Sequence, residues 1–339
     1  MFKARIAGVG SYLPKRCVSN GHLKGMIRGF DEAKAGMPFE EWVENMTGIG
    51  ERYYISEEED IETMGEEASR KAIEDANLKI QDIEFLILTS FTQKREIPNS
   101  ACSLAHRLGL DTIPAFPLNT ACAGFLYGMA IAYSFIKSGW YKNILIVSAE
   151  CLSRAIDPDD PRVAVLLGDG AGAAVLQVSS ETGICSQPFI GSLYSDHLEY
   201  LNSDFQIAKD IGGINYIKKS YLKMPGGPQV LRRAVNSMSE AAICALSKSP
   251  WSAEDIDYLI PHQANARIID GVAEKLNFPK EKVISIIKDM GNNSSATIPI
   301  TLEMAVHGKI QGKNIKRKDK LLFTTVGGGY SVASVVMEY

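Results

Sequence analysis

Apolar and polar positions recur along the chain in a way that predicts two copies of one helix–strand unit. Small and apolar residues have helical spacing at 64–77, and the run DIEFLIL at 82–88 is typical of a buried strand. Residues 239–246 repeat the helical spacing, and DIDYLIP at 255–261 repeats the strand almost residue for residue. We interpret this likeness as an internal duplication.

The two copies also end alike. GDGAGAAVL at 168–176 and GGGYSVASVV at 327–336 are each a glycine turn that leads into a strand. We therefore expect an α/β protein with two similar halves, residues 1–178 and 179–339, whose shared helices are buried between two sheets. Further predicted elements are strands at 6–12, 113–118, 144–148 and 321–326, and a short helix at 39–46 within a loop-rich excursion.

A cysteine lies where a predicted strand meets a long apolar helix. After the strand at 113–118, apolar residues fall on nearly every face up to residue 137, which predicts a helix buried all round. The start of a helix favours a thiolate, because its free N–H groups and positive dipole end lower a cysteine pKa. Cys122 is therefore a candidate nucleophile, and the alternative is a small buried hydrophobe.

His262 and Asn292 are the candidate partners of Cys122. The duplication places His262 at the position of Thr89, just past a strand end, where open α/β sheets bind ligands. Asn292 is expected to open the second-half helix that corresponds to the Cys122 helix. A pseudo-twofold relation between the halves would bring these residues to one cleft. Taken singly, the histidine also fits a solvated loop, and Gly-Asn-Asn fits an ordinary turn or helix cap.

Composition and charge narrow the class of protein. The chain has 339 residues, of which 45% are hydrophobic and 22% charged, so it can bury a large core. A net charge of −4 argues against general nucleic-acid binding, and no apolar run approaches the roughly 20 residues of a membrane span.

The cysteines and the N-terminus indicate the compartment. The six cysteines are widely spaced without a Cys-x-x-Cys pair, which predicts reduced thiols and neither a zinc site nor another metal site. The N-terminus has no signal-peptide core, so we expect a cytoplasmic protein.

Taken together and in this order, the motifs resemble β-ketoacyl-acyl-carrier-protein synthase III, a branch of the thiolase-fold condensing enzymes. They are TACAGF at 120–125, GDGAGAA at 168–174, PHQAN at 261–265, GN at 291–292 and GGG at 327–329, which cover almost the whole chain. The resemblance implies an α-β-α-β-α five-layer sandwich, a homodimer and a triad of Cys122, His262 and Asn292. It also implies an oxyanion hole made by the backbone N–H groups of Cys122 and Gly328.

The resemblance also implies substrates and binding residues. It implies acyl-CoA and a malonyl thioester on acyl carrier protein as substrates, without a metal or redox cofactor. It places five residues near the pantetheine donor and the acidic carrier, although solvated surface charge is the alternative for the arginines: Arg267, Arg232, Arg233, Gly227 and Trp42.

Two departures from the family pattern concern substrate choice. Met46 and Pro161 stand where members often carry arginines that bind the adenine of coenzyme A. The loop at 91–98 and the segment at 24–38 look longer than usual, and MPGGP at 224–228 leaves side-chain volume empty. We therefore expect acyl groups longer than acetyl to be accepted.

The expected reaction is a ping-pong condensation in fatty-acid, lipid or polyketide biosynthesis. Cys122 takes an acyl group, a malonyl thioester loses carbon dioxide at His262 and Asn292, and the carbanion attacks the acyl-cysteine. Alternatives of the same fold are an acyltransferase to oxygen or nitrogen, an enzyme joining two acyl chains without decarboxylation, and a non-catalytic heterodimer partner. A papain-like cysteine peptidase shares the Cys–His–Asn order but not the local sequence around the cysteine.

Overall fold

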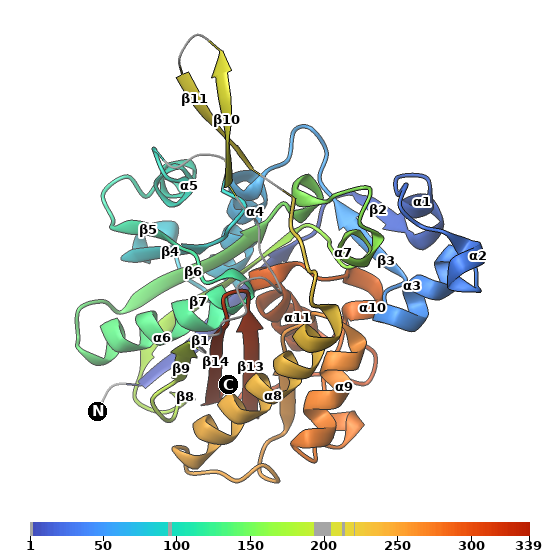
Figure 1. Ribbon diagram of the computed structural model, residues 1–339. Coiled ribbons are helices and arrows are strands. Elements are labelled where there is room, and N and C mark those ends of the chain that lie inside the picture. The colour runs from blue at the N-terminus through green and yellow to red at the C-terminus, as the bar shows by residue number, and fades with distance from the viewer. Residues whose placement is uncertain (1–2, 94–96, 193–204, 212–213, 220) are drawn as a thin grey trace.

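Two five-stranded mixed sheets form the framework of the protein (Figure 1). The computed structural model describes residues 3–93, 97–192, 205–211, 214–219 and 221–339. The first sheet has the order β1 (Lys3–Tyr12), β7 (Gly170–Ser179), β6 (Asn143–Glu150), β4 (Phe85–Thr89), β5 (Ala115–Leu118). The second has the order β12 (Tyr258–Pro261), β13 (Lys320–Gly327), β14 (Ser331–Glu338), β8 (Gly183–Ile184), with β9 (Phe189–Ser192) also paired to β14.

The two sheets repeat one connectivity. In the first, β4 pairs parallel with β6, and β7 lies antiparallel between β6 and β1. In the second, β12 pairs parallel with β13, and β14 lies antiparallel between β13 and β8. A parallel bridge between Leu259 and Val283 stands where the first sheet has β5 beside β4. The duplicated α/β architecture is thus confirmed, while the division after residue 178, near the end of β7, stays a prediction.

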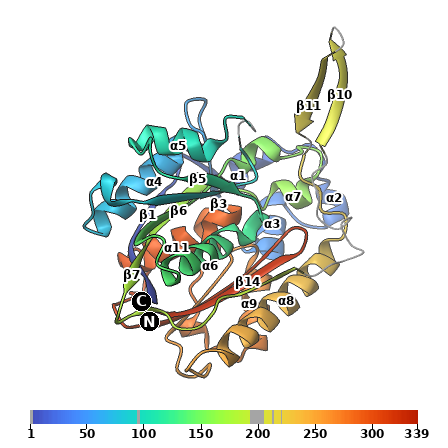
Figure 2. The same cartoon turned by 90° about the vertical axis from the view of Figure 1, so that its left-hand side faces the viewer.

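Helices fill the space between the sheets and cover both outer faces (Figures 1 and 2). The central pair, α6 (Gly124–Lys137) and α11 (Thr297–Val306), is apolar on nearly all sides because a sheet lies on each side of it. Helices α4 (Ile61–Asp75) and α5 (Ser100–Leu108) cover the first sheet, and α8 (Gly227–Ser247) and α9 (Ala266–Lys275) cover the second. This is the expected α-β-α-β-α order.

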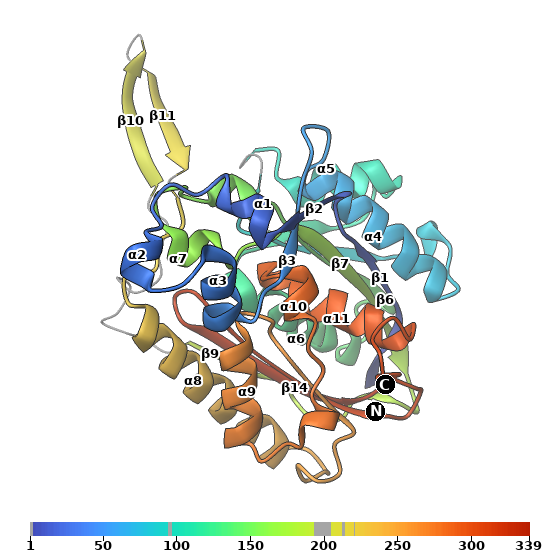
Figure 3. The same ribbon diagram turned by 90° about the vertical axis from the view of Figure 1, so that its right-hand side faces the viewer.

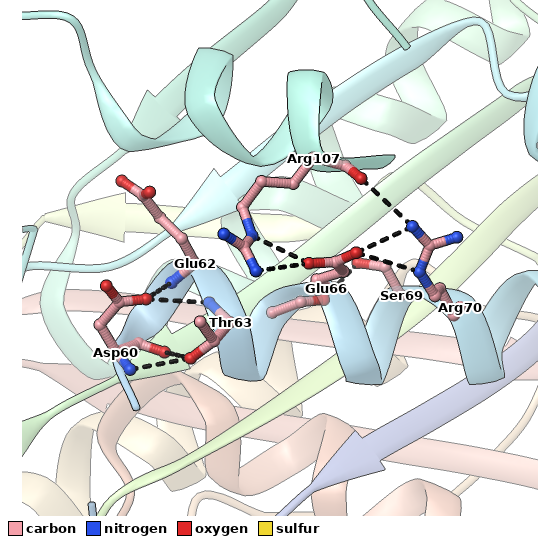
Figure 4. A network of polar contacts seen from close by, with 8 residues as sticks. Asp60, Glu62, Thr63, Glu66, Ser69, Arg70 and Arg107 are labelled. Atoms are coloured by element: carbon pink, nitrogen blue, oxygen red, sulfur yellow. Dashed lines mark hydrogen bonds and ion pairs between the residues drawn. The ribbon is translucent and has the colours of Figure 1, made fainter. Parts of the chain in front are cut away.

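Polar contacts fix the outer helix α4. Its capping box joins Asp60 and Thr63, whose side chains each accept from the other's backbone N–H. One turn later Glu66 accepts from Arg70 on the same helix and from Arg107 on α5 (Figure 4). Glu66 therefore ties together the two helices that cover the first sheet.

The excursion predicted at the N-terminal side lies against the segment before α7 (Figure 3). The backbone N–H of Arg28 donates to Pro158 O at 2.9 Å, and its guanidinium binds both carboxylate oxygens of Asp159 at 3.0 Å. A Cβ on Gly29 would lie 2.2 Å from Asp159 O, so only glycine fits there. The small elements of this region are β2 (Arg16–Ser19), α1 (Asn20–Lys24), α2 (Glu32–Ala35), α3 (Phe39–Thr47), β3 (Glu51–Tyr54), α7 (Pro161–Ala164) and α10 (Ile287–Met290).

Two further features complete the fold. The hairpin formed by β10 (Phe205–Ile211) and β11 (Ile214–Lys219) projects away from the layers (Figures 1, 2 and 3). Helix α8 begins twelve residues before the predicted helix at 239–246, because Pro228 occupies its first turn, where proline is favourable. None of the helices in the described ranges combines the length and the apolar character needed to cross a bilayer.

Candidate active site

One cavity is lined by the three predicted catalytic residues, Cys122, His262 and Asn292. Gly327 and Gly328 of the glycine triplet line the same cavity. Most of the remaining walls are apolar, with residues Phe91, Leu152, Val163, Leu166, Leu167, Leu222, Met224, Val230, Leu231, Ala234, Ile268 and Val326. The cavity therefore combines a small polar cluster with walls suited to an apolar chain.

A left-handed turn presents Cys122 just before α6. Residues Ala121–Ala123 form one turn of 3₁₀-helix, and Ala121 has φ of 48°. The same geometry recurs before α11, where Ser294–Ala296 form a 3₁₀ turn and Ser294 has φ of 51°. The helix predicted to begin at Cys122 therefore begins at Gly124, and the thiol precedes its first turn.

The end of β13 approaches this turn closely. A Cβ on Gly327 would lie 2.5 Å from Thr120 O and 3.1 Å from the backbone nitrogen of Cys122. Two residues earlier, Thr325 Oγ1 donates to Cys122 O at 3.1 Å. Glycine at 327 is thus required for the glycine triplet to lie beside Cys122.

His262 follows β12 directly and is almost fully buried. Its Nδ1 lies 2.7 Å from Thr297 Oγ1, and that hydroxyl donates to Ser294 O at 3.0 Å. Because a hydroxyl has one proton to donate, this arrangement favours the tautomer in which His262 Nδ1–H donates to Thr297. Nε2 is then a proton acceptor.

Gln263 holds the turn that carries His262. This side chain is fully buried, and its Nε2 donates to Pro261 O at 2.7 Å. Its Oε1 accepts from the backbone N–H of Ile286 at 2.9 Å. These two bonds connect the backbone before His262 with the segment at Ile286, and they therefore fix the turn that carries the imidazole.

Burial makes both reactive groups neutral. It raises the pKa of the Cys122 thiol to about 11, and the Ser294 side chain acts in the opposite direction. Burial also lowers the pKa of His262 to about 3. Although Cys122 keeps some exposed surface toward the cavity, its surroundings are apolar and disfavour charge. The expectation of a thiolate in the resting protein is therefore wrong, because desolvation outweighs the effect of the helix start.

Asn292 is held by its backbone and by its side-chain oxygen. The backbone bonds to Leu166 O and to the N–H of Gly168 at 2.8 and 3.0 Å, which connects the turn to the GDG motif. Its Oδ1 accepts from the backbone N–H of Ser294 at 2.8 Å. With that oxygen engaged, the amide NH₂ is the end that can donate to a ligand in the cavity.

Comparisons with known proteins agree with this geometry. Two family models match, "3-Oxoacyl-[acyl-carrier-protein (ACP)] synthase III" over residues 116–191 and its C-terminal counterpart over 246–339. The β-ketoacyl-[acyl-carrier-protein] synthase III of Neisseria gonorrhoeae is 36% identical over 338 residues, or 99% of each chain. The chain belongs to the 3-oxoacyl-acyl-carrier-protein synthase III family.

Solved structures support the same assignment. The crystal structure of 3-oxoacyl-[acyl-carrier-protein] synthase III from Aquifex aeolicus VF5 has a TM-score of 0.87 and 36% identity, covering 99% of this chain and 100% of that one. The priming β-ketosynthase of the R1128 polyketide pathway has a TM-score of 0.86 and 31% identity, covering 99% and 96%. The protein is thus an acyl-transferring condensing enzyme, and the cysteine-peptidase alternative is wrong.

The predicted binding residues of this synthase III family member have different environments. Gly227 lines the cavity, and a Cβ there would meet nothing within 4 Å. Arg267 is exposed at the start of α9 beside the cavity-lining Asn265, and it donates to Asn45 O at 2.8 Å. Arg232 and Arg233 follow the cavity-lining Leu231 on α8.

Met46 and Pro161, the two departures from the family pattern, lie on α3 and at the start of α7. Trp42 is half-buried on α3, with its ring centroid 4.8 Å from that of Phe30 in the excursion, and it is not among the residues lining the cavity. Met46 is 41% exposed, and its sulfur lies 3.6 Å from Arg267 Nη2. Pro161 begins α7. The part of α3 near the cavity mouth therefore presents Met46 beside Arg267.

The sequence did not single out Thr297 or Gln263 as functional. Gln263 lies inside the PHQAN motif, so its position next to a candidate histidine was a usable signal. Thr297 lies five residues after Asn292 at the start of a mostly apolar helix. A hydroxyl in that place was a weaker signal, because its partner is 35 residues away in the chain.

Proposed function

We propose that the protein is a β-ketoacyl-acyl-carrier-protein synthase III that moves an acyl group from acyl-CoA to Cys122 and condenses it with malonyl-acyl-carrier-protein. The observation that carries this proposal is the shared cavity of Cys122, His262 and Asn292, with apolar walls. The pathway would be fatty-acid synthesis or a related lipid or polyketide pathway. Free cysteines at all six positions support a cytoplasmic location.

The first half-reaction uses a neutral thiol and a neutral imidazole. His262 Nε2 accepts the thiol proton as the Cys122 sulfur attacks the thioester carbonyl. The backbone N–H groups of Cys122 and Gly328 bind the oxyanion. The carbon–sulfur bond to Cys122 forms, the bond to the coenzyme A sulfur breaks, and His262 passes the proton to that sulfur, so that coenzyme A leaves as the thiol and His262 is neutral again.

The second half-reaction generates and uses a carbanion. As the malonyl thioester loses carbon dioxide, the enolate oxygen accepts a hydrogen bond from the Asn292 amide. His262 becomes a second donor at Nε2 by taking up a proton from solvent, which the developing negative charge of the enolate favours. The carbanion attacks the acyl carbon, the bond to the Cys122 sulfur breaks, and His262 returns its proton to that sulfur. Each donor contributes about 3 to 4 kcal/mol, and no step requires a metal or a redox cofactor.

Product analysis tests this proposal against the other reactions of the same fold. The protein is incubated with hexanoyl-CoA and malonyl-acyl-carrier-protein, and the β-ketoacyl product and carbon dioxide are quantified. Equal amounts of both, lost in Cys122→Ala, are expected. A product without carbon dioxide would favour joining of two acyl chains, and transfer to a hydroxyl or amine acceptor would favour an acyltransferase.

We also propose a homodimer, supported by the edge of the first sheet. Strand β5 ends the order of described strands in that sheet, and its side chains are only half-buried. Nearby, Trp140 is 69% exposed and stacks on Phe135 with ring centroids 5.7 Å apart. An exposed aromatic surface next to a strand edge suits burial against a second copy. A monomer in sedimentation at micromolar concentration would contradict this.

A further inference from the structure

Glu150 is a buried carboxyl group that the proposed steps do not use. It is the last residue of β6 and is fully buried. Ile146 and Ile144, two and three alternate positions earlier, pack in the core between the sheets, and Ser148 bonds to Thr89. This face of β6 therefore changes from apolar to polar toward the end of the strand nearest Cys122.

The carboxyl group accepts hydrogen bonds from two separate segments. Oε2 accepts from Thr92 Oγ1 at 2.7 Å, from Ser90 Oγ at 3.2 Å and from the backbone N–H of Phe91 at 3.4 Å. Oε1 accepts from Ser295 Oγ at 3.2 Å. These donors are neutral, so the group satisfies a local set of polar atoms and is not half of an ion pair with them.

Both segments reach the acyl cavity. Phe91 lines the cavity from the loop after β4, and Ser294, next to Ser295, lines it from the turn before α11. Thr92 Oγ1 also accepts from the backbone N–H of Cys151 at 2.9 Å, which fixes the loop to the chain after β6. Glu150 thus connects an apolar wall of the cavity with the turn that contains Asn292 and Ser294.

We propose that Glu150 is a positioning residue that holds the Phe91 wall of the acyl cavity and the Ser294–Ser295 turn in one arrangement around Cys122. The inference rests on the proposed function, because it concerns the cavity that would receive the acyl chain. Glu150 touches neither substrate nor the reacting sulfur in this account. It acts on acyl-chain binding through Phe91 and on acylation through the turn beside Cys122.

The chemistry of the carboxyl group identifies the conservative variant. Burial raises the pKa of Glu150 to about 7, and the hydrogen bonds from Thr92, Ser90 and Ser295 act in the opposite direction. Glutamine has the same shape, and its amide oxygen can accept from the three donors of the loop. Its NH₂ group would face Ser295, whose hydroxyl can instead donate to Thr89 O at 3.3 Å. Glu150→Gln should therefore keep the arrangement, and Glu150→Ala should lose it.

The test compares acyl-CoA kinetics of Glu150→Ala and Glu150→Gln with those of Glu303→Gln. Glu303 is a control for the loss of a buried carboxylate outside the cavity, because it is also nearly buried, bonds to Ser11 at 2.9 Å, pairs with Lys309 and does not line the cavity. For each variant, kcat and KM are measured with acetyl-, hexanoyl- and decanoyl-CoA, together with the melting temperature. We expect Glu150→Ala to raise KM about tenfold for the preferred chain and to flatten the preference, since displaced walls lose selective contacts.

The other variants separate positioning from general stability. Glu150→Gln is expected to stay within about threefold of the wild type, and Glu303→Gln to lower the melting temperature without changing the chain preference. If Glu150→Ala does not fold, two single variants test its hydrogen bonds separately. Thr92→Val removes a donor on the Phe91 loop, and Ser295→Ala removes the donor on the turn before α11. Thr92→Val should then change chain preference, and Ser295→Ala should lower the acylation rate.

The outcomes also distinguish this inference from the proposed function. Unchanged preference and KM in Glu150→Ala, or in both single-side variants, would overturn the positioning role while wild-type acylation still stands. An equal change in Glu303→Gln would also overturn it, because the effect would then follow stability alone. Absence of wild-type acylation would instead reject the proposed function.

Discussion

In the proposed mechanism, Cys122 and His262 react from a neutral pair and not from a preformed ion pair. The apolar cavity raises the thiol pKa to about 11 and lowers the imidazole pKa to about 3, so both shifts favour the uncharged forms. Proton transfer to His262 then accompanies attack on the thioester. We therefore expect the free thiol to react slowly with reagents in solution and mainly with bound thioesters.

Alkylation should show this directly. With a thiol pKa of about 11, the thiolate fraction of Cys122 at pH 7 is about one in ten thousand. Because the reactive form is the deprotonated one, the rate of modification by iodoacetamide should rise with pH up to at least pH 9. Peptide mapping gives the rate at Cys122, with the exposed Cys102 as an internal control. A rate that is already constant below pH 7 would contradict the neutral pair.

Thr297 should control which nitrogen of His262 accepts the proton. Replacing it with valine removes the hydroxyl at 2.7 Å from Nδ1 while keeping the shape of the side chain. We expect kcat to fall about ten- to a hundredfold with little change in KM, because the tautomer with Nε2 as acceptor loses its support. Thr297→Ser should restore most of the rate. Nitrogen chemical shifts of His262 report the tautomer, and an unchanged tautomer in the valine variant would contradict this role.

The strands and helices of the layers could be predicted from the sequence, whereas the two turns that contain Ala121 and Ser294 could not. The strands around 82–88, 144–148 and 321–326 and the apolar α6 have strong local patterns, because each is buried between layers. Ala121 and Ser294 have left-handed backbone conformations although neither is a glycine, so the sequence does not indicate these turns. The surrounding layers impose the conformation.

The residues of the site could likewise be predicted only where a local motif contains them. The motifs indicated Cys122, His262 and Asn292, which the structure brings to one cavity. The thiol pKa could not be predicted, because the helix-start argument is local and the opposing desolvation comes from residues throughout the chain. Glu150 and Thr297 were missed for the same reason. Glu150 bonds to residues 58 to 60 positions earlier and to Ser295, 145 positions later, and Thr297 bonds to His262, 35 positions earlier.

The first turn of α8 should set how long an acyl chain fits. Gly227 lines the cavity, and a Cβ there meets open space, so Gly227→Val would fill that space without disturbing the backbone. Each methylene displaced from an apolar wall loses about 0.8 kcal/mol, so decanoyl-CoA should lose about tenfold or more in kcat/KM relative to acetyl-CoA. Gln229→Val, on the exposed side of the same turn, is the control. Equal effects on all chain lengths would contradict a tunnel beside Gly227.

For the whole molecule, the duplication places a shared cavity between two halves of similar topology. The entire chain has a net charge of −4, but Arg232 and Arg267 are exposed close to residues that line the cavity. Arg232 is exposed on α8, directly after the cavity-lining Leu231, and Arg233 is its neighbour. Such a pair can guide an acidic carrier protein toward the cavity.

Charge reversal should therefore separate the two substrates. Arg232→Glu with Arg233→Glu is expected to raise the KM for malonyl-acyl-carrier-protein about tenfold and to leave the KM for acyl-CoA within about twofold. Lys280→Glu with Lys316→Glu makes the same change in net charge at exposed positions that do not line the cavity. Steady-state kinetics at low and high salt measure the effect. The same increase for both substrates, or in the lysine variant, would argue against a docking role.

The central claim is that Cys122 carries the acyl group between two half-reactions. Intact-protein mass spectrometry after incubation with acetyl-, hexanoyl- or decanoyl-CoA tests it most directly. We expect a gain of one acyl mass per chain, located at Cys122 by peptide mapping, absent from Cys122→Ala and lost when malonyl-acyl-carrier-protein is added. An adduct that persists in Cys122→Ala, or that malonyl-acyl-carrier-protein does not discharge, would contradict the claim.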